Sequence, residues 1–166
     1  MSILKVDTIN EKTSGNGVQI AGHVVQVVQG FDNTQSNTNN STDTEALTGL
    51  RTSITPKSTS NKILVMVSYH VVTNGSTSHN AVFIKRSTDG GSSFSNLANY
   101  LQGTGNEIHR NAQSNGLFSQ STQVILDSPA TTSACMYNLF FRTNGGNIRL
   151  NDNGAGCRII LQEIAQ

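Results

Sequence analysis

The sequence predicts an all-β protein: an antiparallel β-sandwich with an extended segment at its N-terminus. Two observations support this fold class. Short stretches rich in β-branched residues are separated by turn residues about every ten positions. No stretch with helical periodicity reaches the length of an ordinary helix, roughly 10–12 residues. A chain of 166 residues is long enough to bury one core. We therefore expect an N-terminal segment over residues 1–22 and one head domain over residues 23–166.

The most strongly patterned strand is expected over residues 62–73. Apolar side chains occupy every second position there from Ile63 to Val71, and these should face the core. The other extended segments are expected at residues 2–9, 17–20, 23–31, 50–55, 81–87, 121–126, 134–143, 148–151 and 158–164.

Turn residues separate these strands. Gly and Asn tolerate positive φ, so turns are expected at residues 89–91, 144–146 and 152–154. Residues 32–44 are expected to form a polar loop. Residues 94–118 carry no clear pattern, and residues 97–101 fit either one helical turn or a strand.

Two expected strands, residues 62–72 and 158–164, carry bulky aliphatic side chains on both faces. The outer face of a monomeric sandwich should be polar. One sheet is therefore expected to bury its outer surface as well, most simply against symmetry mates around a three-fold axis. The alternative is that the N-terminal segment folds back over that face.

Composition and charge argue against several partners. The net charge is +1 and no Lys/Arg cluster exceeds Lys85-Arg86, so no nucleic-acid partner is expected. The longest apolar run, residues 63–67, is far shorter than the roughly 20 residues that span a bilayer. The N-terminus lacks the long apolar run of a secretory signal. We expect a chain made in a cytoplasm, with no membrane insertion.

No catalytic, metal or cofactor site is expected. Cys135 and Cys157 are interpreted as reduced, buried small hydrophobes, and the four His residues lack ligand spacing. Residues 151–154 resemble the start of a calcium loop, but the downstream Glu is missing, so they are interpreted as a turn. The ten acidic residues form no obvious pair, and no nucleophile, metalloprotease or phosphate-loop motif occurs. The chain is expected not to be an enzyme.

Six segments in a consistent order carry a resemblance to a known class of proteins. They are LKVDTI (4–9), TSGNGV (13–18), GHVVQV (22–27), LTGLRTSITP (47–56), SNKILV (60–65) and RIILQEI (158–164). Together they resemble tail fibres and related virion structural proteins of tailed bacteriophages, including cyanophages. The resemblance covers both ends and about half of the chain.

The resemblance implies a homotrimer whose head is a jelly roll similar to the tumour necrosis factor and complement globular-head folds. It implies that the N-terminal segment docks on other phage proteins of the tail, baseplate or capsid. The candidate docking residues are Ile3, Leu4, Val6, Ile9, Val18 and Ile20. Heads of this kind often bind a receptor or glycan on the host surface.

Any glycan site is expected in loops. His79, Tyr100, His109 and Arg110 carry groups that stack on sugars or hydrogen-bond to hydroxyls. The leading hypothesis is therefore a short tail fibre that contacts the host, located in the virion after assembly in the host cytoplasm. The alternative is a decoration protein that stabilises the capsid. A glycan-cleaving tailspike is a third, weaker reading.

Overall fold

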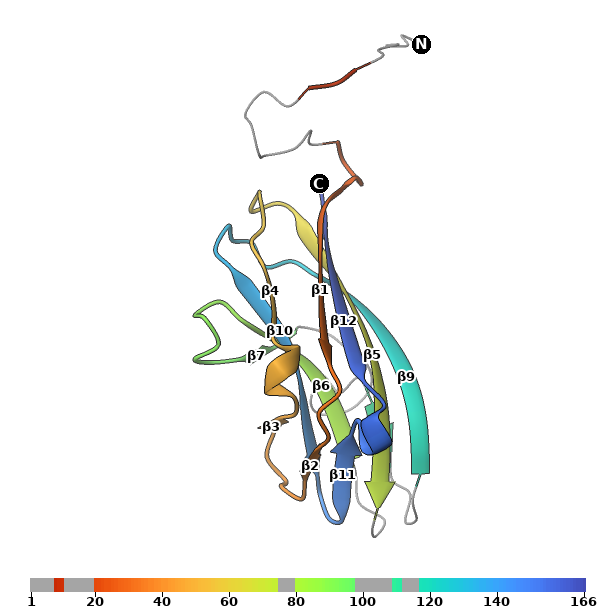
Figure 1. The fold of residues 1–166 in the computed structure, drawn as a ribbon. Helices are drawn as coiled ribbons and strands as arrows, with labels where there is room; N and C mark the ends of the chain where they lie inside the picture. Colours follow the sequence, from red (N-terminus) through yellow and green to blue (C-terminus); the bar gives the residue numbers. More distant parts are fainter. Residues whose placement is uncertain (1–7, 11–19, 75–79, 98–108, 112–116) are drawn as a thin grey trace.

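Two antiparallel sheets pack face to face in the computed structural model, which describes residues 8–10, 20–74, 80–97, 109–111 and 117–166 (Figure 1). Within these ranges the helical segments are two single 3-10 turns, η1 (Thr48–Leu50) and η2 (Asp152–Gly154). The predicted all-β class and the two-sheet packing are confirmed.

Sheet A forks around its longest strand. It contains β1 (Val24–Asp32), β2 (Ser36–Thr38), β5 (Lys62–Asn74), β9 (Leu117–Asp127), β11 (Asn147–Leu150) and β12 (Cys157–Ile164). On one side β5 pairs with β9 from Ile63 to Thr73. On the other side it pairs first with β12, as far as Ser68, and then with β11, from Val71 onward. β1 extends the β12 branch and β2 extends the β11 branch.

Sheet B is built on one central pair of strands. Its members are β3 (Thr44–Glu45), β4 (Thr52–Ile54), β6 (Asn80–Ser87), β7 (Ser95–Asn96), β8 (His109–Asn111) and β10 (Cys135–Thr143). β10 pairs with β6 along eight positions, and β3 and β4 pair with its other edge. β7 and β8 both pair with the free edge of β6.

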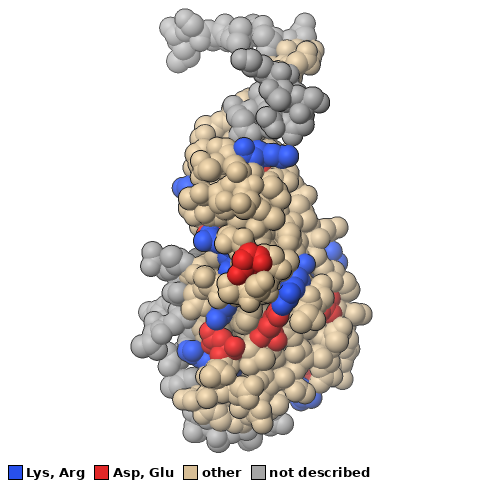
Figure 2. Space-filling view, turned by 90° about the vertical axis from the view of Figure 1, so that its left-hand side faces the viewer, with Lys and Arg blue, Asp and Glu red and all other residues tan. Residues whose placement is uncertain are grey.

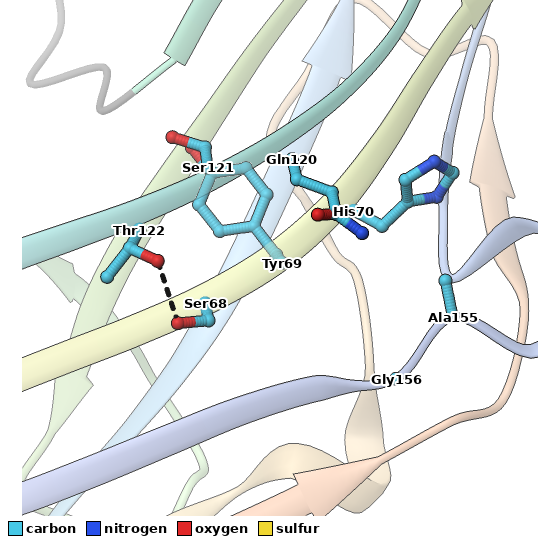
Figure 3. Close-up of a pocket in the computed structure, with 8 residues that line it drawn as sticks. All are labelled: Ser68, Tyr69, His70, Gln120, Ser121, Thr122, Ala155 and Gly156. Carbon is cyan, nitrogen blue, oxygen red and sulfur yellow. Dashed lines mark hydrogen bonds between the residues drawn. The ribbon is translucent and has the colours of Figure 1, made fainter.

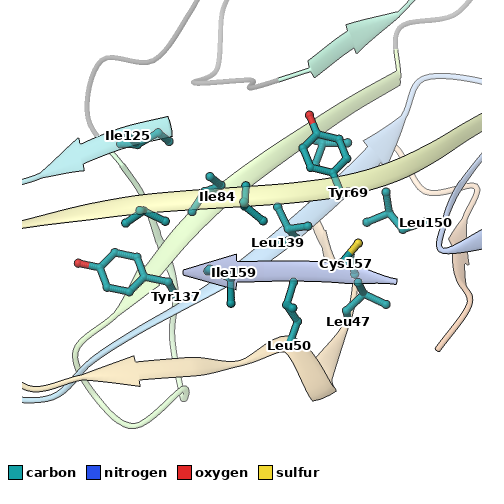
Figure 4. Close-up of a cluster of buried hydrophobic side chains, with 14 of the residues drawn as sticks. Leu47, Leu50, Tyr69, Ile84, Ile125, Tyr137, Leu139, Leu150, Cys157 and Ile159 are labelled. Carbon is teal, nitrogen blue, oxygen red and sulfur yellow. The ribbon is translucent and has the colours of Figure 1, made fainter. Parts of the chain in front are cut away.

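The core lies between the sheets, as the alternation in β5 predicts (Figure 4). Ile63, Val65, Val67, Tyr69 and Val71 are all at most 2% exposed. Side chains of β6, β10, β11 and β12 complete this layer. Its members carry few polar atoms, so hydrophobic burial is the main stabilising term, about 25 cal/mol per Å² of apolar surface removed from water.

The outer face of sheet B has a small apolar cluster of its own. Phe83 and Phe140 are buried there, although they point away from the main core. The Lys85 Nζ lies 4.9 Å from the centre of the Phe140 ring, and the Arg142 guanidinium lies 4.9 Å from that of Phe83. Asp43 bonds both cations, at 2.6 and 3.2 Å. Figure 2 shows acidic and basic side chains adjoining on the side of the molecule where β4, β7 and β10 lie.

Buried polar contacts tie neighbouring elements together. The Asp127 carboxylate at the end of β9 accepts hydrogen bonds from Arg86 and Tyr137 of sheet B, at 2.6 and 2.7 Å. This contact connects the two sheets at one edge. Glu163 of β12 is fully buried and accepts hydrogen bonds from β1 and from the segment between β4 and β5.

Two local expectations were wrong. Residues 32–44 are not a continuous loop, because Ser36–Thr38 forms β2 at the edge of sheet A. Its residues are all polar, so it lacks the apolar alternation that identifies a strand. The strand expected at residues 50–55 is shorter, because η1 ends at Leu50 and β4 covers only Thr52–Ile54.

The turn expected at residues 152–154 is a single 3-10 turn. It follows Asn151, which has a φ of 58°.

Both cysteines are buried and unbridged, as expected. Burial raises the pKa of the Cys157 thiol to about 12 and also raises the pKa of Cys135. The Cys157 Sγ lies 2.9 Å from the Asn151 Oδ1, to which the protonated thiol donates. Both side chains therefore behave as small hydrophobes in the core.

Candidate functional site

One half of the outer face of sheet A carries mostly apolar side chains, although a face in contact with solvent is expected to be polar. Residues directly opposite each other in an antiparallel pair point to the same face. Leu64 lies opposite Leu126, and Met66 lies opposite both Val124 and Ile160. The resulting surface, called here the apolar face, is formed by Val24, Val27, Leu64, Met66, Val124, Leu126, Ile160 and Ile164.

Water reaches much of this surface. Val27, Val124 and Leu126 are 56, 45 and 54% exposed, although they lie within long strands of the sheet. The other members from β5 and β12 are half-buried. Lys62, Gln162 and Gln29 share this face, opposite Ile164, Leu64 and Ile160. Isolated exposed apolar residues are ordinary, but a group of eight spread over four adjacent strands is typical of an interaction surface.

The other half of this face is polar and contains a pocket of about 410 Å³ (Figure 3). It lies at the fork of sheet A, where β5 passes from β12 to β11. Its lining residues come from β5, from β9 and from the segment that leads into β12. They are Ser68, Tyr69, His70, Gln120, Ser121, Thr122, Ala155 and Gly156. The pocket exists because β12 begins at Cys157, so no strand continues beside the β5 residues at the fork.

The pocket is lined by neutral polar groups. The Ser68 and Thr122 hydroxyls hydrogen-bond at 2.9 Å across β5 and β9. The Gln120 amide lies opposite the His70 imidazole in the next row of the sheet. The His70 Nδ1 is shielded from solvent and has no hydrogen-bond partner among the described residues. Such an atom costs about 1–3 kcal/mol if left unpaired.

Two exposed aromatic rings flank the pocket. Phe118 of β9 is 62% exposed, and its ring centre lies 6.2 Å from that of His70. Phe31 of β1 is 53% exposed and lies over Gly156, where an added Cβ would come within 2.3 Å of the Phe31 Cε2. Phe31 also packs 5.2 Å from the Arg158 guanidinium. Within the described ranges these are the exposed Phe side chains.

The candidate residues chosen from the sequence lie elsewhere. Ile3, Leu4, Val6, Val18, His79 and Tyr100 are outside the described residues. Ile9 and Ile20 are 57 and 51% exposed and belong to no strand. His109 and Arg110 were expected in a loop, but they lie in β8, whose backbone pairs with β6 at Val82 and Ala81. The described part of the chain brings none of these residues to the pocket.

Two tyrosines that are buried in the core have raised pKa values. Burial raises the pKa of Tyr69 to about 12 and raises that of Tyr137 well above its usual range. Such hydroxyls stay protonated at neutral pH. Among the described residues no group of three or more His, Cys, Asp and Glu side chains is arranged to hold a metal ion. No helix in those ranges is both long and apolar enough to cross a membrane.

Comparison with known proteins gives no assignment. The sequence matches no protein-family model, and a search of curated proteins finds no match.

Sequence reasoning missed the pocket because its residues are distant in the chain and individually ordinary. The uninterrupted run Val124-Ile125-Leu126 was a usable signal for the apolar face. Only Ile125 of the three is buried in the core, so its neighbours on either side must point outward.

Proposed function

We propose that this chain is a structural protein of a bacteriophage virion and that it works by assembly as a homotrimer. The apolar face of sheet A carries the assembly part of the proposal. Water contacts side chains there that are typical of a protein interior, and burial against a second and third copy would remove them from it. The virion part rests on the resemblance of six sequence segments to phage fibre proteins.

The strand order supports a jelly roll for the head. If the short edge strands β2, β3 and β11 are left out and β7 and β8 are counted as one, eight strands remain along the chain. Sheet A then has the order first, eighth, third and sixth, namely β1, β12, β5 and β9. The second, seventh and fourth, namely β4, β10 and β6, follow one another in sheet B, with β7 and β8 beyond them. Such alternation between two sheets is typical of eight-stranded jelly rolls, the head that the phage resemblance implies.

Of the possible roles, we favour a short tail fibre that contacts the host. The neutral polar pocket with its exposed aromatic rims is the observation that favours attachment over a purely mechanical role. The second candidate is a capsid decoration protein, which would use the same apolar face to form a trimer. We propose no catalytic activity, and the N-terminal segment over residues 1–22 would dock on the virion.

The assembly proposal is tested by placing a charge on the apolar face. Leu126→Lys should convert the assembly to monomers, because a buried ammonium in an apolar interface is costly. The matched control is Ser53→Lys, on an exposed position of β4 in sheet B, which should leave the mass unchanged. If both variants keep the mass of the unmodified protein, the apolar face is not the interface.

The virion proposal is tested by imaging purified phage particles with a label on this chain. Density on the tail supports the fibre role, and density on the capsid shell supports decoration. Absence from both contradicts the virion assignment. Incubation with host polysaccharide provides a separate test, since release of saccharide products would contradict the proposed lack of catalysis.

A further inference from the structure

We propose that the pocket at the fork of sheet A is a binding site for a neutral oligosaccharide, with Phe31 and Phe118 as stacking platforms. This inference specifies the class of ligand for the proposed attachment role. It rests on the proposed function only in placing that sugar on the host surface.

The lining groups match the chemistry of a sugar. A pyranose presents hydroxyls that both donate and accept, and apolar C–H faces between them. The pocket offers the same mixture through the Ser68 and Thr122 hydroxyls, the Gln120 amide and the His70 imidazole. A ligand hydroxyl that pairs with the His70 Nδ1, after a small rotation of the ring, would satisfy an atom that now has no partner.

The rims supply the apolar part. An exposed ring packs well against the C–H face of a sugar, because both surfaces are then removed from water. Phe118 borders the pocket at β9, and Phe31 borders it at the start of β12. The two residues are three strands apart across the sheet and four positions apart along β5, which is about 20 Å at ordinary strand spacing. One sugar ring cannot contact both, so the ligand is an oligosaccharide.

The charge distribution argues for a neutral sugar. None of the eight lining residues is Asp, Glu, Lys or Arg. Two cations lie on this face near the pocket. Arg158, opposite Ser68, stacks its guanidinium on Phe31 and donates to the Gln29 Oε1 at 3.4 Å. Arg149, opposite Val72, is paired with the Asp152 carboxylate at 3.1 Å. An acidic sugar would find no free cationic partner within the pocket lining.

Gly156 provides a sharp test of the Phe31 rim. It is not among the glycines with positive φ, so alanine is compatible with its backbone. The added Cβ would collide with the Phe31 ring and displace it. Gly156→Ala should therefore weaken binding as Phe31→Ala does, while the aromatic side chain is retained.

The experiment uses the full chain and a panel of neutral pentasaccharides, namely cellopentaose, maltopentaose and mannopentaose, with titration calorimetry and saturation-transfer NMR. At least one is expected to bind, with saturation transfer to its C–H protons. Phe118→Ala and Gly156→Ala should each weaken binding at least tenfold, whereas Ser53→Ala, at an exposed position of β4 in sheet B outside the pocket, should not. Glucuronic acid oligomers should bind no better than neutral ones.

Three results would overturn the inference: no binding by any pentasaccharide of the panel, equal binding by Phe118→Ala, or binding confined to the acidic oligomers and lost in Arg158→Gln. The test is separable from that of assembly. Phe118→Ala should keep the mass of the unmodified protein, and Leu126→Lys should retain binding to free pentasaccharide. Immobilising the sugar on a surface distinguishes a surface glycan from a soluble ligand. Only a surface glycan can occupy several pockets of one assembly at once, which raises its apparent affinity.

Discussion

Glu163→Ala is expected to destabilise the head severely, because the carboxylate it removes is a buried junction between three segments. The Glu163 side chain is 0% exposed. Its Oε1 accepts from the Lys57 backbone N–H at 2.6 Å and from the Asn61 Nδ2 at 2.7 Å, and its Oε2 accepts from the Gln26 Nε2 at 2.5 Å. All three partners are neutral donors.

The expected loss of stability depends on whether each donor can reach water once the carboxylate is removed. Asn61 is 1% exposed, so its amide cannot reach bulk water, whereas Gln26 is only partly buried. A buried donor left unpaired costs about 1–3 kcal/mol. With the cavity left by the side chain, we expect a loss of about 3–5 kcal/mol. Glu163→Gln keeps one acceptor oxygen but turns its amide nitrogen toward a donor, so about 1–3 kcal/mol is expected.

The assay is urea unfolding followed by circular dichroism, with all variants at the same protein concentration because assembly makes apparent stability depend on it. Ser53→Ala, an exposed polar position in β4, is the control and should change stability by no more than about 0.5 kcal/mol. The reasoning fails if Glu163→Ala costs less than about 1 kcal/mol, or if Glu163→Gln costs more than Glu163→Ala.

Three further predictions concern charges and thiols. The Arg51 hydrogen bond lowers the pKa of Glu45 below its ordinary value of 4.5. The stability that the Glu45 carboxylate contributes is therefore fully present above pH 4.5 and is lost as the pH falls through the lowered pKa. Glu45→Gln should accordingly flatten the acid limb of a stability–pH curve. Because burial raises the pKa of Cys157 to about 12, neither this thiol nor Cys135 should react with a disulfide reagent at pH 8 until urea unfolds the chain, and prompt reaction would contradict the buried placement. Asp127→Ala should cost about 2–4 kcal/mol in urea unfolding, since it leaves the donors of two partners in sheet B unpaired; an unchanged midpoint would show that this contact does not hold the sheets together.

The strongest strand was predictable because burial alone determines its pattern. From Ile63 to Val71 every second side chain faces the core, and a period of two is visible without any knowledge of the partners. β2 was not predictable in this way, because Ser36–Thr38 is held by backbone pairing with β11 at an edge. Edge pairing imposes little demand on side chains, so it leaves little trace in the sequence.

The candidate site was predictable only in part. The apolar outer face was foreseen from the two-faced strands that became β5 and β12, because Leu64, Met66 and Ile160 have no reason to be apolar in an exposed sheet. The pocket was not foreseen, since it depends on where β12 begins relative to β5. That register is set by tertiary pairing, and Gly156 and Phe31 are adjacent only in the fold.

The central claim is that the apolar face of sheet A is an interface between copies of this chain. The most direct measurement is the mass of the unmodified protein by sedimentation equilibrium, over a wide concentration range. The account predicts a species of three times the 17.7 kDa of one chain, stable on dilution to micromolar concentration. A single species of 17.7 kDa throughout the range would contradict it.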